Sequence, residues 1–181
     1  MIDREMLDKI ILTDEGNNWW KPELFIKNTL PLLPKELEVL ANPLPYDENY
    51  NCFIYALGLH NDKELLKETK GFIYDAFFQK LIDLGELHLT DEPQNGDWVL
   101  YKDMKNYPKM ITHIGTLDNG KVISKWAWGP LIKHDLWDVP SSYGDNVQYV
   151  KAISPEQAKI LCEKYKEFNV LPADEKSSNI L

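Results

Sequence analysis

The periodicity of the apolar residues changes once along this chain, and that change constrains the fold more than any other feature. Between Phe72 and Leu84 the apolar side chains recur every three or four residues, which predicts an amphipathic helix. From Trp98 onward, short strand-like segments follow turn signals, and residues 118–120 (Asp-Asn-Gly) are typical of a β-hairpin. Helices first and strands later favour an α+β fold, with the helices packed on an antiparallel sheet.

Local signals place most of the expected elements. A short helix is predicted over residues 2–12. A second helix is predicted over residues 154–168, where Ser154 and Gln157 match the capping-box pattern around Pro155. The expected strands cover residues 98–101, 111–117, 121–126 and 147–153.

The connecting segments complete the expected domain organisation. Residues 129–144 contain two prolines and two glycines and are expected to form a loop. We expect one domain over residues 1–171, with its core at 46–153, followed by a flexible tail at 172–181.

Charge and composition restrict the classes of function. The chain has a net charge of −9 and no Lys/Arg run, which argues against nucleic acid as the principal ligand. No apolar run approaches the roughly 20 residues that span a bilayer, and residues 1–6 lack the features of a signal peptide. We therefore expect no membrane partner and a cytoplasmic location, with export by a signal-independent route as the alternative.

The stretch around Cys52 is the first candidate for chemistry. Asn51 is a good N-cap residue, and the apolar residues that follow it predict a short helix with Cys52 in its first turn. Free N–H groups and the helix dipole at that position favour a thiolate, which is the nucleophilic form of cysteine. The alternative is a small core residue, because free cysteine is among the most buried residue types. Cys162 falls on the apolar face of the C-terminal helix and is expected to be a core residue of that kind.

His113 is the natural partner for a nucleophilic cysteine. It lies in the expected strand 111–117, where alternation gives His113 and Gly115 the same face. A strand histidine that faces a cysteine at a helix start can take the thiol proton and later return it to the leaving group. The alternatives are a structural histidine and a zinc site built from Cys52, His113 and His134, which the spacing does not favour over the dyad. We expect no metal and no cofactor.

Four segments, taken in order, resemble the NlpC-type cysteine peptidases of the papain-like superfamily. Those enzymes carry a cysteine at a helix start, a Gly-Asp strand opening, a His-Val-Gly strand and an Asn-Gly hairpin. The matching segments here are residues 51–56, 96–101, 113–115 and 119–123. The resemblance implies a papain-like fold and a peptidase or amidase, with Cys52 attacking the carbonyl carbon and His113 acting as base and then acid.

The third catalytic residue that this resemblance implies falls on Ser124. Serine orients an imidazole less well than a carboxylate or an amide does, so His134 is the alternative, and Lys125 and Asp97 are weaker ones. A Cys–His dyad can work without a strong third member, since that residue mostly fixes the tautomer and orientation of the imidazole.

The remaining expected site residues would surround the nucleophile. The Cys52 backbone N–H and one side chain would stabilise the oxyanion. The candidates for that side chain are Asn51, Tyr50 and Tyr46. Trp126 and Trp128 could wall a substrate cleft, and core packing is an equally good reading for both.

A second resemblance is closer and extends to about residue 150. It is to an uncharacterised group of bacterial domains with recurring Tyr-Asn-Cys, Thr-His, Ser-Lys-aromatic and Tyr-Gly motifs and a late histidine. Here these are residues 50–52, 112–113, 124–126, 143–144 and His134. This resemblance implies no particular activity.

Two functions follow as expectations. The first is a cysteine hydrolase or acyltransferase that cleaves or exchanges an amide bond in a peptide or protein substrate. The second is a papain-like domain without catalytic activity that binds a protein partner. The sequence does not define the oligomeric state.

Overall fold

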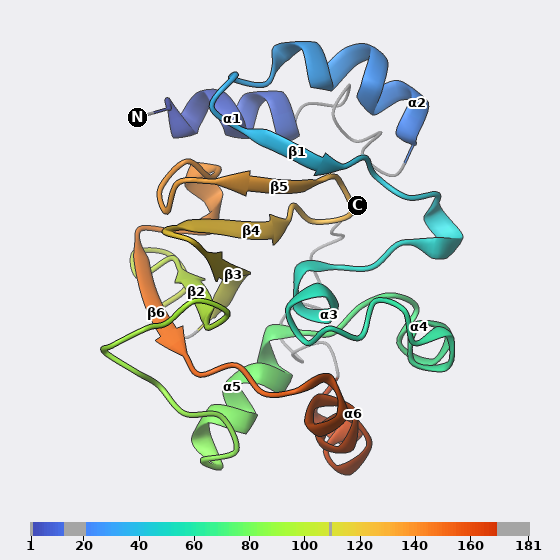
Figure 1. The fold of residues 1–181 in the computed structure, drawn as a ribbon, viewed down its shortest axis with the longest axis vertical. Helices are drawn as coiled ribbons and strands as arrows, with labels where there is room; N and C mark the ends of the chain where they lie inside the picture. Colours follow the sequence, from blue (N-terminus) through green and yellow to red (C-terminus); the bar gives the residue numbers. More distant parts are fainter. Residues whose placement is uncertain (1, 13–20, 109, 170–181) are drawn as a thin grey trace.

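A six-stranded antiparallel sheet organises the computed structural model, which describes residues 2–12, 21–108 and 110–169 (Figure 1). The strands are β1 (Glu38–Ala41), β2 (Trp98–Lys102), β3 (Ile111–Asp118), β4 (Lys121–Lys125), β5 (Leu131–His134) and β6 (Asn146–Val150). Their spatial order is β1-β5-β4-β3-β2-β6, and every neighbouring pair is antiparallel. The tail expected at 172–181 lies outside the described residues.

The predicted α+β class and the β3–β4 hairpin are confirmed. Asn119 and Gly120 form the hairpin turn with φ angles of 52° and 81°, the left-handed pair that a tight two-residue turn requires. Two strands were not predicted. β5 lies inside the segment expected to be a loop, and β1 lies in the half of the chain expected to be helical. Both have four residues, too few for a clear alternation signal, and β1 is an exposed edge strand.

The helices are α1 (Arg4–Leu12), α2 (Pro22–Leu24), α3 (Cys52–Ala56), α4 (Lys63–Thr69), α5 (Asp75–Asp83) and α6 (Pro155–Lys164). The helical path of α2 continues through a π-helical turn (Phe25–Thr29) and a 3-10 turn (Leu30–Leu32). In Figure 1, α1 and α2 lie beyond the β1 edge of the sheet, and the other four helices lie toward the opposite side of the molecule. Within the described residues, no helix is both long and apolar enough to cross a membrane.

The helix predictions are confirmed at α1, α5 and α6. The α6 capping box is complete, because Ser154 Oγ accepts from the Gln157 backbone N–H and Gln157 Oε1 accepts from the Ser154 backbone N–H. α4 was not predicted, because its residues are mostly charged and none of them is buried.

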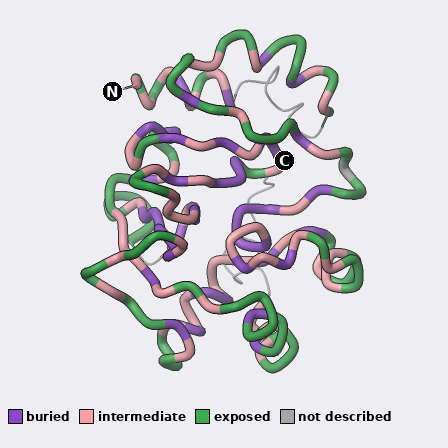
Figure 2. Tube along the Cα trace, in the orientation of Figure 1, coloured by how far each residue is buried: buried purple, intermediate pink, exposed green. Residues whose placement is uncertain are grey.

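Alternation along the strands divides the core into two layers. Trp98 and Leu100 of β2 pack with α3, α5 and α6, and we call this side of the sheet the α3 face. Val99 and Tyr101 pack with residues of α1, and we call this side the α1 face. β2 is buried along its whole length because both of its faces are covered. Figure 2 shows the same pattern, with buried stretches along the central strands and α3 and exposed outer turns on α4 and α6.

Candidate functional site

Cys52 begins α3, as predicted, because Asn51 caps the helix. Asn51 Oδ1 accepts from the backbone N–H of Ile54 at 3.3 Å, and Asn51 Nδ2 donates to the backbone carbonyl of Ile73 at 2.7 Å. The Asn51 backbone N–H donates to the carbonyl of Gly71. The amide considered as an oxyanion donor is therefore already bonded to Ile73, and Asn51 serves to fix the start of the helix.

The Cys52 thiol is buried, with 6% of the residue exposed. Burial raises its pKa to about 12. The backbone N–H groups of Ile114, Phe53 and Cys52 itself, and the charge of Lys125, act in the opposite direction without overcoming the loss of solvation. The Ile114 amide belongs to the peptide that joins His113 to Ile114, so the sulfur reaches β3 beside the backbone of His113.

The His113 side chain extends toward the other side of the sheet. It pairs across the ladder with Tyr101 on the α1 face, whereas Ile114 packs with Cys52 on the α3 face. The His113 ring stacks on Tyr143 with centroids 3.9 Å apart, and its buried Nε2 has no hydrogen-bond partner in the described part of the chain. Burial, followed by the charge of His134, lowers its pKa well below 6.5. His113 is therefore a neutral imidazole near neutral pH.

Ser124 and His134, the two main candidates for the third catalytic residue, bind each other. Ser124 Oγ and His134 Nε2 are 2.9 Å apart, and His134 Nδ1 lies 2.8 Å from the carbonyl of Asp135. Because a carbonyl can only accept, Nδ1 carries the proton and Nε2 accepts from the Ser124 hydroxyl. Trp126 Nε1 completes the chain by donating to Ser124 Oγ at 3.1 Å. No hydrogen bond among the described residues joins either candidate to His113.

Four further candidates lie elsewhere in the fold. Asp97 accepts from Lys151 Nζ at 2.8 Å and from the Gln94 backbone N–H at 2.8 Å, which ties the start of β2 to the segment after β6. Trp126 is completely buried, so it is a core residue and not a cleft wall. The Trp128 carbonyl accepts from Asn49 Nδ2 at 2.5 Å. Tyr46 begins a 3-10 turn, but its side chain lies outside the described part of the structure.

Lys125, expected only as a weaker candidate for the third catalytic residue, is buried at the end of β4. It is 2% exposed, its ammonium donates to the carbonyl of Gly129, and Nζ lies 5.3 Å from the centroid of the Tyr50 ring. None of the ion pairs among the described residues includes it. Burial lowers the pKa of Lys125 to about 7, and the charge of Cys52 acts in the opposite direction. The sequence did contain a signal for its position. Lys125 lies at the end of an expected strand, and alternation along that strand places its side chain on the same face as Ile123, two positions earlier.

Tyr143 belongs to the 3-10 turn Ser141–Tyr143, and its ring stacks on the His113 ring. Its carbonyl accepts from Thr112 Oγ1 at 2.5 Å, and Gly144 follows with a φ of 108°, where an added Cβ would overlap the Lys102 carbonyl. Burial, and then the charge of Cys52, raises the pKa of Tyr143 well above 10. Among the described residues, the Tyr143 hydroxyl makes no hydrogen bond of ordinary geometry, although the Ala127 backbone N–H is close enough to favour its ionised form.

The chain is thus an α+β domain in which Cys52, at the start of α3, and the buried Lys125, at the end of β4, act on each other's pKa, and we call this pair the Cys52 centre. A family model described as a domain of unknown function (DUF7689) matches residues 43–151, more than half of the 181-residue chain, and the chain belongs to this family. No curated protein and no solved structure shows significant similarity to it. The matched range contains Cys52, His113, Lys125 and Tyr143. Within the described residues, no three or more His, Cys, Asp or Glu side chains are arranged to hold a metal ion.

Proposed function

We propose that this domain is a cysteine hydrolase or acyltransferase of papain-like type, with Cys52 as its nucleophile and an amide bond of a peptide or protein as its substrate. One observation carries the proposal. Cys52 begins a capped helix, its sulfur lies at the Ile114 backbone N–H, and the buried Lys125 is close enough to act on its pKa. Core cysteines rarely have a buried amine for a neighbour, because burying an amine is unfavourable unless something compensates for it.

Lys125 is the proposed base. With a pKa of about 7 it is largely a free amine at slightly alkaline pH and can accept a proton. In the proposed step, the thiol proton moves to Lys125 Nζ as the sulfur forms a bond to the carbonyl carbon. The carbon–nitrogen bond then breaks, and the leaving amine takes that proton from the Lys125 ammonium. Water, or a second amine in acyl transfer, then cleaves the thioester and restores the thiol.

His113 is the alternative base, as the resemblance to NlpC-type peptidases implies. It is neutral and its Nε2 is unpartnered, so its protonation state suits the role. Its register places the side chain on the α1 face, away from the side on which Cys52 packs. Lys125 is therefore favoured, and the two assignments differ in a measurable way.

A domain without catalytic activity that binds a protein partner is the second candidate function. The observations that favour it are the low exposure of Cys52 and its raised pKa, together with the mutual hydrogen bond of Ser124 and His134. In that case Lys125 and Cys52 would be buried neighbours, and the protonation state of one would not affect the reactivity of the other.

The pH dependence of Cys52 alkylation distinguishes these readings. We would measure iodoacetamide labelling between pH 5 and 9 in a Cys162→Ser background, with mass mapping to Cys52. A thiol that shares its proton with Lys125 titrates as a pair, so the rate should rise up to an inflection near pH 7 and then level off. Lys125→Met, which keeps the length and apolar stem of the side chain, should abolish the inflection, and His113→Ala should retain it.

The opposite results have equally clear meanings. An inflection that survives Lys125→Met and disappears in His113→Ala would assign the base to His113. A rate that rises tenfold per pH unit up to pH 9 in the parent chain would indicate an isolated buried thiol, and would leave the binding-module function in its place.

A further inference from the structure

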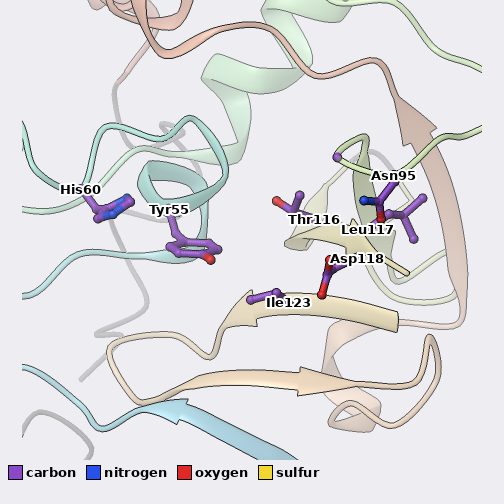
Figure 3. A pocket seen from close by; sticks show the side chains of 8 residues that line it. Tyr55, His60, Asn95, Thr116, Leu117, Asp118 and Ile123 are labelled. Atoms are coloured by element: carbon purple, nitrogen blue, oxygen red, sulfur yellow. The ribbon is translucent and has the colours of Figure 1, made fainter. Parts of the chain in front are cut away.

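A pocket of about 330 Å³ opens between α3 and the far end of the β3–β4 hairpin. Tyr55 of α3 and His60 from the segment after it form one wall, and residues of β3 and β4 form the other (Figure 3). The lining residues are Tyr55, His60, Asn95, Gly96, Thr116, Leu117, Asp118 and Ile123.

The pocket adjoins the Cys52 centre along one aromatic wall. The His60 ring has its centroid 5.5 Å from the Tyr50 ring and 5.5 Å from the Tyr55 ring. Tyr50 in turn contacts the Lys125 ammonium with its face. On β4, Ile123 in the pocket and Lys125 in the centre are two positions apart and share the α3 face, a spacing of about 7 Å. A ligand in the pocket would therefore lie about one strand repeat from the centre.

Asp118 is the acidic residue that lines the pocket. Asp118 accepts from Lys133 Nζ at 2.5 Å and from Asn119 Nδ2 at 3.0 Å, and a carboxylate has about four acceptor sites, so capacity remains. Burial, and then the charge of Asp118, raises the pKa of Tyr55, which indicates that the phenol and the carboxylate are close together.

His60 adds a ring face to the pocket. Its Nδ1 is buried without a hydrogen-bond partner among the described residues, and burial lowers its pKa below 6.5, so the ring is neutral near neutral pH. Asp118 and the nearby Glu38 both act on Lys133, so two acidic groups share one basic group beside the pocket. The whole chain carries a net charge of −9, which attracts cations.

We propose that this pocket binds a basic side chain, of the arginine or lysine type, in the peptide substrate. The aliphatic stem packs on Ile123, and the cationic head bonds to Asp118 across the pocket from the wall formed by Tyr55 and His60. The proposed binding of a basic side chain is supported by the lining of the pocket alone. Its role next to a reacting amide bond rests on the proposed function.

The test is an NMR titration of the full chain with N-acetyl-arginine methylamide as the probe and N-acetyl-norleucine methylamide as the uncharged match. The arginine probe should shift the amide signals of Thr116, Asp118 and Ile123 and bind more tightly than the norleucine probe. Asp118→Asn should weaken arginine binding about tenfold, the effect of losing one charge-assisted hydrogen bond.

Asp135→Asn is the matched control. Asp135 is also a strand-end carboxylate paired with a lysine, at 2.8 Å from Lys121, but it lies outside the pocket. This variant should leave arginine binding unchanged. Equal binding of the arginine and norleucine probes in the parent chain, or equal affinities of Asp118→Asn and the parent, would overturn the proposal.

The titration does not involve the thiol, so its outcome is independent of the proposed chemistry. A Cys52→Ser chain should bind the arginine probe as the parent does. Suppose that arginine binding depends on Asp118 but the alkylation profile lacks the inflection near pH 7. This result would support the proposed binding of a basic side chain and contradict the proposed enzymatic function. An inflection near pH 7 without arginine binding that depends on Asp118 would contradict the proposed specificity for a basic side chain and support the proposed enzymatic function.

Discussion

At the scale of single residues, burial decides the charge states of four candidate residues. Cys52, His113, Lys125 and His134 are all at most 6% exposed, and burial is the largest cause of the pKa shift of each. Each shift favours the neutral form. Near pH 7, Cys52, His113 and His134 are therefore neutral, and Lys125 is divided between its amine and ammonium forms.

His134 should make the stability of the fold depend on acid pH. Its pKa is about 4 in the folded chain, against about 6.5 in an unfolded one, so between these values the unfolded chain binds more protons. Stability should therefore fall as the pH drops below 6.5, by up to about 3 kcal/mol near pH 4. The lowered pKa of His113 adds a fall of the same sign.

Urea unfolding at pH 7 and pH 4.5 measures this effect. His134→Gln should reduce the difference in stability between the two pH values, whatever its effect on the absolute stability. The same substitution at exposed His88 is the matched control. An unchanged difference in His134→Gln would mean that the buried imidazole is not the source.

At the scale of elements, the close approach of β3 and β4 explains the glycine in the His-Ile-Gly segment. A Cβ on Gly115 would overlap Val122 Cγ1 and would lie 3.1 Å from Ser124 Cβ. The missing side chain lets the two strands hold Ser124 where it can bind His134. Sequence reasoning identified the motif, and the strand packing supplies its physical cause.

Gly115→Ala should therefore destabilise the fold by about 1–3 kcal/mol, the usual effect of overpacking a buried site. Val122→Ala removes the overlapping atom, so the double variant should be more stable than the sum of the two single effects implies. Urea unfolding of the four chains measures the coupling. If the two losses in the free energy of unfolding simply add, Val122 is not the side chain that requires a glycine at position 115.

At the scale of the whole molecule, α1 completes a site that lies outside its own part of the sequence. Arg4 donates to the carbonyls of Val139, Pro140 and Gly144 at 2.9, 3.0 and 2.6 Å. Asp8 accepts from the hydroxyl groups of Ser141 and Ser142. These contacts hold the turn that carries Tyr143, although α1 precedes the range that the family model matches.

Arg4→Gln should loosen that turn without unfolding the sheet. Hydrogen exchange of the amides in residues 139–145 should accelerate by about tenfold or more, because three charge-assisted hydrogen bonds are lost. Lys9→Gln, an exposed change on the same helix, should have no such effect. Equal exchange in both variants would show that the turn holds its position without α1.

The two strands that were not predicted show where local patterns lose their value. β4 and β3 carry a recognisable hairpin turn between alternating apolar residues, and both were predicted. β5 and β1 have four residues each, and their pairing with one another joins positions 90 or more residues apart, so it is a long-range property of the folded sheet. The papain-like character of the fold remains a prediction, whereas the α+β class is confirmed.

The sequence by itself determined α1, α5 and α6, the strands β2, β3, β4 and β6, the hairpin turn, the α6 capping box and the position of Cys52 at a helix start. These features depend on contacts between near neighbours, which spacing and residue type express directly. Only the tertiary structure decided that Lys125 would be buried where it acts on the pKa of Cys52, that Ser124 and His134 would bind each other, and that α1 would hold Tyr143 in place. Those outcomes depend on strand register and on burial. Both are set by contacts between segments that come together only in the folded chain.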